Sequence, residues 1–465
     1  MNTNLPERSP DYLNPIPSDH PLYSISVICQ SKLLLRQEIP ASDEEFQELI
    51  KKQYIQEVPG IDETVIGHVC RRCGNQSHHW FGKIPQGRTQ AVYCRKCIEM
   101  GRVSTFEPLY RWTGPEMPCP KVENPCQWDG RLTKFQEAAS EKIKAAMADR
   151  EQLLVWAVCG AGKTEMLFAG LTDAITRGDR ICLATPRADV VRELVPRFRQ
   201  AFPDVTISAL YGGSEEKKEG AQLVISTTHQ LLRFEEAFDV MIIDEVDAFP
   251  YHADKSLSFA SERARRTSSS LIYLTATPRK GLKWKARLQW IPVVFVPARY
   301  HGYPLPIPHF VSTFRLAKHF SKDTLPKAIQ AWIQKKHGQQ RRFLLFVPTI
   351  EMAENLSKIT GIDRVDAADP DRIDKIEGYR RGEMNALITT TILERGVTFP
   401  SIDVAVIDAG HNVFDEAALV QIAGRSGRNA ADPDGDVVFF HQGLTKGMKG
   451  ARKMIAMMNR LARRN

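Results

Sequence analysis

The sequence predicts an α/β fold, in which two tandem lobes with parallel sheets follow a small cysteine-rich module. From residue 131 onward, short apolar runs typical of buried strands alternate with helical patterns, as expected for parallel sheets. These runs form two series, separated by residues 291–310, which contain five prolines and are expected to form a hinge. Upstream, two Cys-x-x-Cys pairs are separated by 20 residues. These observations indicate a protein with two α/β lobes and a cleft between them.

Each strand prediction rests on a short, nearly continuous apolar run. The first series comprises residues 153–158, 181–185, 223–227, 240–244 and 271–277. The second series comprises residues 343–349, 386–391, 404–410 and 437–442. The chain ends in RKMIAMMNRLARRN, a basic amphipathic pattern that we interpret as a terminal helix docked on the second lobe, rather than a nucleic-acid or membrane-surface helix.

The remaining boundaries follow from changes in composition. We expect five segments, of which the first carries little signal. They are 1–65, the N-terminal region; 66–101, the cysteine module; 102–130, a connector rich in Pro, Gly and Trp; 131–298, the first lobe; and 299–465, the second lobe.

Composition and charge narrow the class of protein. The chain has 465 residues, 43% of them hydrophobic, which is enough to bury large cores. The net charge of +8 is compatible with an anionic binding partner. The chain contains no apolar run of 18 residues, as a transmembrane helix would need. Its polar, proline-rich N-terminus lacks the apolar stretch of a secretory signal. We therefore expect a cytoplasmic protein, associated with a membrane peripherally at most.

The stretch AVCGAGKT (157–164) is a candidate phosphate-binding loop between a predicted strand and a predicted helix. Its glycines let backbone N–H groups curve around phosphate oxygens, its lysine adds charge at the β- and γ-phosphates, and its threonine offers a hydroxyl to Mg²⁺. Ala157 replaces the first glycine of the usual pattern, at a position that starts the turn. A chance glycine turn is the alternative, and the strand–loop–helix context disfavours it. The candidate ATP-binding residues are Gly160, Ala161, Gly162, Lys163, Thr164 and Glu165.

Two carboxylates follow a second apolar run, VMIIDEVDAF (240–249). In phosphate-loop enzymes, an aspartate in the place of Asp244 holds Mg²⁺. Its neighbour Glu245 would orient and deprotonate the attacking water. A solvated acidic turn is the alternative.

The DEVD tetrad resembles the DExD box of superfamily-two helicases, and further motifs of that superfamily follow in order. The resemblance implies two RecA-like lobes separated by a cleft. ATP binding closes this cleft, and ATP hydrolysis releases it. The ordered set covers residues 131–430. The matching stretches are LTKFQ (132–136), ATPRADVVREL (184–194), STTHQLL (226–232), TATP (275–278), LLFVPTIEMAENL (344–356), TTTILERGVTFP (389–400) and QIAGRSGR (421–428).

This resemblance also implies roles for individual residues. Gln136 would read adenine, and Arg425 and Arg428, at i and i+3 on one helical face, would reach the γ-phosphate as arginine fingers. Arg395–Gly396 fit the motif at the cleft wall. The candidate contacts to the DNA backbone, each with a structural alternative, are Thr185, Arg187, Thr228, Thr349 and Thr390.

The four cysteines Cys70, Cys73, Cys94 and Cys97 have the spacing of a zinc site. Four thiolates would close a tetrahedral shell around Zn²⁺ and leave no open position, so the site would be structural rather than catalytic. Basic and aromatic residues lie around it, which suits single-stranded nucleic acid or an ordinary surface with a small core. They are Arg71, Arg72, Trp80, Phe81, Lys83, Arg88, Tyr93, Arg95 and Lys96.

A four-cysteine module in front of a DEVD motor most resembles the ComFA family of late-competence ATPases. That resemblance implies DNA-stimulated ATP hydrolysis with Mg²⁺ and translocation on single-stranded DNA during uptake of transforming DNA, at the inner face of the membrane. Implied protein partners are ComFC, DprA and ComEC, and a homo-oligomer is compatible with it. Two alternatives remain open: a replication-restart helicase similar to PriA or another nucleic-acid helicase, and a zinc-ribbon DNA tether with a regulatory ATPase.

Overall fold

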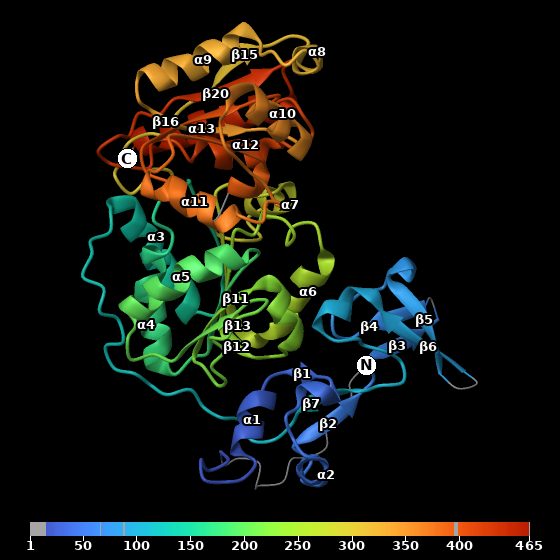
Figure 1. Ribbon diagram of the computed structural model, residues 1–465. Coiled ribbons are helices and arrows are strands. Elements are labelled where there is room, and N and C mark those ends of the chain that lie inside the picture. The colour runs from blue at the N-terminus through green and yellow to red at the C-terminus, as the bar shows by residue number, and fades with distance from the viewer. Residues whose placement is uncertain (1–14, 66, 87–88, 395–398, 465) are drawn as a thin grey trace. The chain divides into compact units, whose positions relative to one another are not determined.

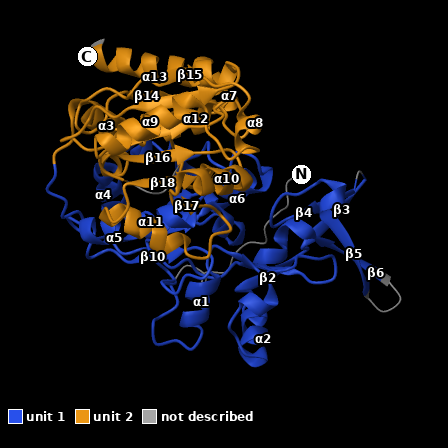
Figure 2. Ribbon diagram, turned by 45° about the horizontal axis from the view of Figure 1, so that its top comes forward, with its two compact units in different colours: residues 1–130, 143–153, 168–273 blue, residues 131–142, 154–167, 274–465 orange. Residues whose placement is uncertain are grey.

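The computed structural model describes residues 15–65, 67–86, 89–394 and 399–464. Its contacts divide the chain into two compact units (Figure 2). Unit 1 comprises residues 1–130, 143–153 and 168–273, and unit 2 comprises residues 131–142, 154–167 and 274–465.

The N-terminal part of unit 1 has its own small core. Helix α2 begins where Ser42 accepts a hydrogen bond from the backbone N–H of Glu45, whose carboxylate accepts one from the N–H of Ser42. The three-stranded antiparallel sheet β1-β7-β2 includes a strand from residues 109–112, so this stretch is part of the N-terminal fold. The elements are α1 (Tyr23–Cys29), β1 (Leu33–Leu34), α2 (Asp43–Lys51), β2 (Ile55–Val58) and β7 (Leu109–Trp112).

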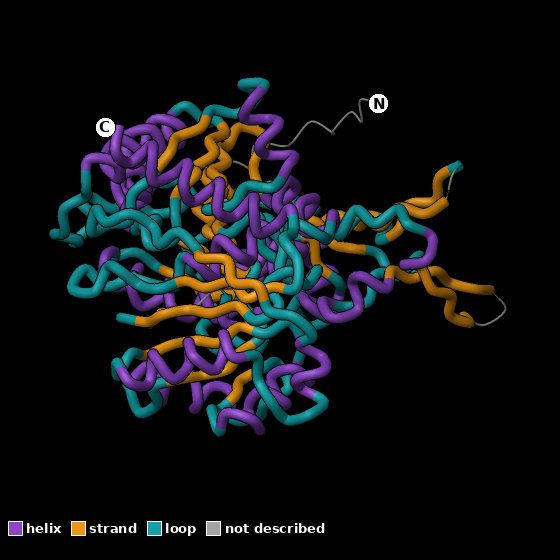
Figure 3. Tube along the Cα trace, turned by 90° about the horizontal axis from the view of Figure 1, so that it is seen from above, coloured by secondary structure: helices purple, strands orange, loops and turns teal. Residues whose placement is uncertain are grey.

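The cysteine module consists of two antiparallel hairpins and short 3₁₀ turns. Each hairpin ends next to one cysteine pair, since β4 ends at Cys70 and β6 ends at Cys94. Figure 3 shows the hairpins as two arms of the chain. The elements are β3 (Ile61–Thr64), β4 (Gly67–Cys70), η3 (His78–Trp80), β5 (Phe81–Gln86), β6 (Thr89–Cys94) and η4 (Arg95–Met100).

A seven-stranded sheet of order β10-β11-β9-β12-β13-β8-β14 confirms the first predicted α/β lobe. Figure 1 labels β11, β12 and β13 of this sheet. All five predicted strands are present, and the division between the units passes through β8 and β13. The strands are β8 (Gln152–Ala157), β9 (Ile181–Thr185), β10 (Ile207–Leu210), β11 (Leu223–Thr227), β12 (Phe238–Asp244), β13 (Arg265–Thr275) and β14 (Val293–Val296). The helices are α3 (Lys134–Ala148), η5 (Glu165–Leu167), α4 (Phe168–Arg177), α5 (Ala188–Ala201), η6 (Thr228–Arg233), α6 (Lys255–Ala264) and α7 (Lys280–Arg287).

The second lobe is built on an all-parallel sheet of order β15-β20-β19-β16-β18-β17. Its core packs Phe343 and Leu345 of the sheet against Ile329 and Trp332 of α9. The strands are β15 (His309–Ser312), β16 (Arg342–Phe346), β17 (Arg364–Val365), β18 (Ala386–Thr389), β19 (Ile402–Val406) and β20 (Val437–His441). The helices are α8 (Leu316–Phe320), α9 (Lys327–Gly338), α10 (Ile350–Thr360), α11 (Arg372–Arg381), η7 (Thr391–Leu393), α12 (Glu416–Ala423) and α13 (Lys446–Arg464).

The hinge prediction is wrong for the first part of the proline-rich stretch, because that part is an ordered strand. Strand β14 pairs in parallel with β8, from Val293 opposite Leu154 to Val296 opposite Ala157. The predicted docking of the terminal helix is confirmed, since Met448, Ile455 and Met458 of α13 are buried and α13 contacts α12.

Candidate nucleotide and metal sites

The candidate phosphate loop follows β8 and turns on its two glycines. Gly160 has φ +76° and Gly162 has φ +67°, a left-handed conformation that an L side chain rarely adopts. The loop closes where the backbone N–H of Ala161 donates to the carbonyl oxygen of Val158 over 3.2 Å. Lys163 and Thr164 follow, both half-buried, before the short turn η5. This backbone can present N–H groups to an anion.

The side chain of Gln136 lies directly against this loop. Its Oε1 accepts from the backbone N–H of Thr133 over 2.8 Å, and its Nε2 donates to the carbonyl oxygen of Ala161 over 2.9 Å. A Cβ at Gly162 would lie 2.4 Å from Gln136 Nε2, so any larger residue would push the Gln136 side chain away from the loop. Gln136 therefore supports the loop, in addition to the adenine-reading role that the resemblance implies.

The two carboxylates of the DEVD tetrad stand at the carboxyl end of β12, in unit 1. Asp244 ends the strand, and its Oδ1 accepts a hydrogen bond from the backbone N–H of Glu245 over 2.9 Å. Glu245 has φ +52°, an unusual value for a glutamate, and it begins a tight turn in which the backbone N–H of Ala248 donates to its carbonyl oxygen over 2.8 Å. Asp247 is fully buried. Non-glycine residues in this conformation cluster at functional sites.

The expectation that Arg425 and Arg428 share one helical face is wrong. Helix α12 ends at Ala423, and both arginines lie in the turn that follows, where Gly427 has φ +65°. The last helical residue is Ala423, and the positive φ of Gly427 turns the chain between the two arginines. Arg425 is almost fully buried, and its Nε donates to the carbonyl oxygen of Glu394 over 3.1 Å. Arg428 Nε donates back to the carbonyl oxygen of Gly424 over 3.0 Å.

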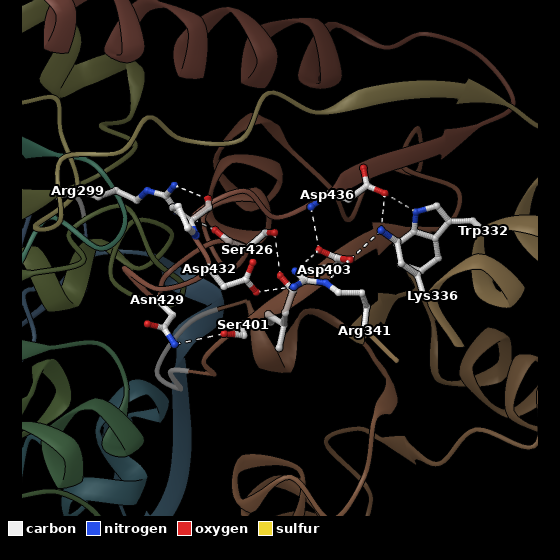
Figure 4. A network of polar contacts seen from close by, with 12 residues as sticks. Arg299, Trp332, Lys336, Arg341, Ser401, Asp403, Ser426, Asn429, Asp432 and Asp436 are labelled. Carbon is white, nitrogen blue, oxygen red and sulfur yellow. Dashed lines mark hydrogen bonds and ion pairs between the residues drawn. The ribbon is translucent and has the colours of Figure 1, made fainter. Parts of the chain in front are cut away.

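Arg299 holds this turn in place, and the sequence carried no signal for it. Its buried guanidinium donates to the carbonyl oxygen of Ser426 over 3.0 Å (Figure 4). It also donates to the carbonyl oxygens of Gly427, Pro304 and Pro433, the last over 3.0 Å. Burial, together with the charge of Arg428, lowers the pKa of Arg299 to about 10. A planar group with five donors is suited to bridging several carbonyls at once.

The candidate DNA contacts occupy different environments. Thr185 and Thr228 are fully buried at the ends of β9 and β11, so their hydroxyls do not reach the surface in this conformation. Arg187 precedes α5 and pairs with Asp189 over 3.3 Å. Thr349 is exposed and caps α10, accepting from the N–H of Met352 over 3.1 Å, and Thr390 is half-buried before η7. Arg395, Gly396 and Arg88 lie outside the described residues.

The four predicted zinc ligands come together. The sulfur atoms of Cys70, Cys73, Cys94 and Cys97 lie within 4.8 Å of one another, and all four side chains are fully buried. The Sγ–Sγ distances are 3.7 Å for Cys70–Cys97 and 3.5 Å for Cys73–Cys94. A tetrahedral ion with metal–sulfur bonds of about 2.3 Å would space its sulfurs about 3.8 Å apart. The cluster therefore fits a tetrahedral metal ion of the size of Zn²⁺.

Most charges around the cysteines are engaged within unit 1. The buried guanidinium of Arg72 pairs with Glu38 over 2.6 Å and donates to the carbonyl oxygen of Met100, so it is not available to nucleic acid. Glu38 also pairs with Arg233 over 2.7 Å. Lys96 pairs with Asp254 over 2.7 Å, which ties the module to the start of α6. Arg72 therefore has a structural role, which corrects its interpretation as a surface cation.

Comparison with known proteins identifies the family. The model of the competence protein ComFA N-terminal domain matches residues 21–111. A competence protein ComFA from Bacillus subtilis is 45% identical over 445 residues, which cover 93% of this chain and 94% of that protein. The chain belongs to the ComFA family. A competence protein ComFA from Streptococcus pneumoniae is 38% identical, with 89% of this chain and 95% of that protein covered.

Two further family models place enzymatic domains in this ComFA chain. The type III restriction enzyme res subunit model matches residues 129–280, and the helicase conserved C-terminal domain model matches residues 323–430. This ComFA chain is therefore an ATPase with helicase domains. Those domains imply that it binds a nucleotide and nucleic acid, and the cysteine cluster can hold a metal ion.

Solved structures confirm the fold. The helicase domains resemble Saccharomyces cerevisiae Dbp5 bound to RNA and ADP BeF3, with a TM-score of 0.53 and 16% identity, covering 71% of this chain and 88% of that chain. Mycobacterium smegmatis helicase Lhr, bound to ssDNA and AMP-PNP, gives a TM-score of 0.51 at 17% identity, covering 71% of this chain and 50% of that chain. Among the described residues of this ComFA chain, no helix is long and apolar enough to cross a membrane.

Proposed function

We propose that this chain is an ATP-dependent translocase on single-stranded DNA that drives uptake of transforming DNA during natural competence. The observation that carries the proposal is the match to ComFA proteins along more than nine-tenths of the chain, with helicase domains behind the cysteine module. The paired glycines at positive φ at the end of β8 support a working phosphate loop.

Each side chain of the motor has a proposed task. Lys163 and Thr164 bind the phosphates, Asp244 and Thr164 hold Mg²⁺, and Glu245 orients the attacking water and accepts its proton. Magnesium, when bound, would neutralise charge on the phosphate oxygens. Arg425 and Arg428 stabilise the γ-phosphate once the turn that carries them is held by Arg299.

Four cysteine thiolates hold a structural Zn²⁺ in this proposal, since their buried sulfurs leave no open coordination position. The domains of the proposal follow the predicted segments, with lobes at 131–298 and 299–465. By the same resemblance, we infer a cytoplasmic protein, peripheral at the inner face of the membrane, that works with ComFC, DprA and ComEC. Homo-oligomers are compatible with this proposal.

The test measures ATP hydrolysis with single-stranded DNA, duplex DNA and RNA. Single-stranded DNA should stimulate hydrolysis most, and stimulation by RNA alone would refute the uptake role. Lys163→Ala should abolish hydrolysis with an unchanged melting temperature, whereas Lys335→Ala, at an exposed lysine of α9, should behave as wild type. ATP-dependent displacement of streptavidin from a biotinylated strand end tests movement. ATP-gated affinity without displacement would favour a tether.

A further inference from the structure

A basic and aromatic surface lies almost entirely in the segment between the two matched helicase models. The first of these models ends at residue 280, and the second begins at residue 323. Of the eighteen large apolar side chains that are exposed in the described part of the chain, eight lie between residues 284 and 314. They are Trp284, Leu288, Trp290, Phe295, Tyr300, Tyr303, Ile307 and Phe314. Such a concentration of exposed apolar area marks an interaction site.

Helix α7, Lys280–Arg287, is the centre of this surface. None of its eight described residues is buried. Two ion pairs hold it to the start of α12 within unit 2: Arg279 with Asp415 over 2.5 Å, and Lys283 with Glu416 over 3.0 Å. Trp284 is 60% exposed, and Trp290, just after the helix, is 74% exposed. Arg279 and Lys283 therefore fix the helix to α12, while Trp284 and Trp290 remain exposed to solvent.

The aromatic surface continues onto the adjoining sheet edge. The ring of Phe295, on β14, lies 5.3 Å from that of Trp156 on β8, and Lys283 Nζ lies 5.8 Å from the centre of the Trp156 ring. Strand β14 is the last strand of its sheet. Flat aromatic groups thus extend from α7 onto an edge that no further described strand covers.

Uncompensated positive charge is interleaved with these rings. Residues 279–291 contain five arginines and lysines and no acidic residue. Within the part of the chain that the structure describes, Lys280, Lys285 and Arg287 make no ion pair, and all three are exposed. The surface should therefore attract an anionic ligand.

We propose that Lys280, Trp284, Lys285, Arg287 and Trp290 form a binding platform for single-stranded DNA. The tryptophan rings would stack on bases, and the cations would contact phosphates, which is how proteins bind single strands without reading sequence. The choice of DNA rests on the function proposed above. The platform lies outside the helicase motifs that contain the candidate DNA-contacting residues. It would therefore give the ATPase an additional DNA-binding site.

The arrangement of the side chains favours a nucleic acid over two other partners. The centre of a protein–protein interface is depleted of charge, but here Lys280 and Arg287 lie about one helical turn before and after Trp284. A helix that lies on a membrane separates its cationic face from its apolar face. In α7, the i, i+4 and i+7 positions Lys280, Trp284 and Arg287 share one face. Cations on the same face as an aromatic ring suit a ligand in which phosphates alternate with bases.

The closing experiment measures binding of a fluorescent oligo(dT) to the full chain by anisotropy. Stacking of one base is worth about 1–3 kcal/mol, or roughly 5- to 150-fold in affinity. Trp284→Ala with Trp290→Ala should weaken binding at least about tenfold, and the corresponding double phenylalanine variant should restore most of it. Lys280→Glu with Lys285→Glu should weaken binding and flatten its salt dependence. Ile373→Ala and Lys335→Glu, exposed elsewhere in unit 2, are the matched controls.

The outcomes separate the platform from the proposed function. If the wild-type chain binds oligo(dT) and the double alanine variant binds equally well, the platform is wrong and the translocase proposal stands. Failure of the wild-type chain to bind any single strand overturns both. Loss of binding to anionic lipid vesicles, with DNA binding retained, would assign the surface to a membrane and overturn the platform. Photocrosslinking of bromodeoxyuridine-containing DNA should label a peptide containing Trp284 or Trp290.

Discussion

Cys159 donates a hydrogen bond from Sγ to Oε1 of Gln421 over 3.0 Å, and both side chains are buried. Cys159 belongs to the phosphate loop, and Gln421 opens the QIAGRSGR stretch, 262 residues later. The loop therefore touches the helix that leads into the arginine turn. Next to this contact the space is full, because a Cβ at Gly424 would lie 2.4 Å from Cys159 Cβ.

Gly424→Ala should disrupt this contact. Overpacking of this kind costs about 1–3 kcal/mol, so the melting temperature should fall and ATP hydrolysis should drop as the loop and the turn are pushed apart. The matched rescue is Cys159→Gly, which removes the clashing Cβ: the double variant should melt higher than Gly424→Ala alone. A Gly424→Ala variant with wild-type melting and hydrolysis would contradict the packing described here.

Arg299→Ala should remove the support of the arginine turn. It leaves the carbonyl groups of Ser426, Gly427 and Pro433 without their buried donor, and each orphaned group costs about 1–3 kcal/mol. We expect a large drop in melting temperature and loss of ATP hydrolysis.

Arg299→Lys separates the need for a charge from the need for a planar fork of donors. A single ammonium cannot span these carbonyls, so lysine should recover only part of the stability. Arg460→Ala, at an exposed arginine of α13, is the control. Full recovery by lysine would show that charge alone is sufficient and that the fork geometry is not needed.

Removing the metal should unfold the cysteine module. Elemental analysis of the wild-type chain should find one zinc ion per chain. The double variant Cys70→Ser with Cys73→Ser should bind none, whereas Cys126→Ser, outside the cluster, should retain the ion. Binding of a structural zinc ion contributes on the order of 10–16 kcal/mol in isolated small modules, so proteolysis should begin within residues 67–100 after loss of the ion. A metal-free preparation with wild-type resistance to protease would contradict a structural zinc site.

Local patterns predicted the elements whose burial is continuous along the chain. The nine predicted strands are apolar runs in the two parallel sheets, and all nine are present. Short or edge strands were missed, among them β10, β14 and β15, because long-range pairing rather than local composition defines them. The same reason applies to the N-terminal sheet, where β1 has two residues and β7 is contributed from residues 109–112.

The same distinction between local and long-range signals applies to the residues of the candidate site. The phosphate loop and the four cysteines are readable because short spacing encodes their geometry, and the structure places them as loop and cluster. The helical arrangement of Arg425 and Arg428 is wrong because α12 ends at Ala423, before either arginine, in a stretch with glycines at 424 and 427. The roles of Arg299 and of Arg72 depend on partners far along the chain, Ser426 and Glu38, so no local pattern could indicate them.

Asp403→Asn should reveal an acid-sensitive network in the second lobe. The buried carboxylate of Asp403 pairs with Lys336 over 2.7 Å and with Arg341 over 3.0 Å, and it accepts from the backbone N–H of Asp436 over 2.9 Å (Figure 4). Burial by itself would raise the pKa of Asp403, but the hydrogen bonds from Arg341 and Lys336 outweigh it, and the pKa is lowered. Breaking a buried pair costs about 3–5 kcal/mol. Because Asp436 still pairs with Lys336, we expect the lower end of this range for the variant at pH 7.

The sign of the pH dependence follows from the lowered pKa. A carboxyl group with a depressed pKa in the folded state stabilises the fold above its unfolded pKa of about 3.9 and loses that contribution as the pH falls toward the folded value. The melting temperatures of wild type and Asp403→Asn should therefore differ most near pH 7 and converge below about pH 4. Asp323→Asn, at an exposed aspartate, should follow wild type throughout. A gap that widens on acidification would mean that the pKa of Asp403 is raised, not lowered, in the folded protein.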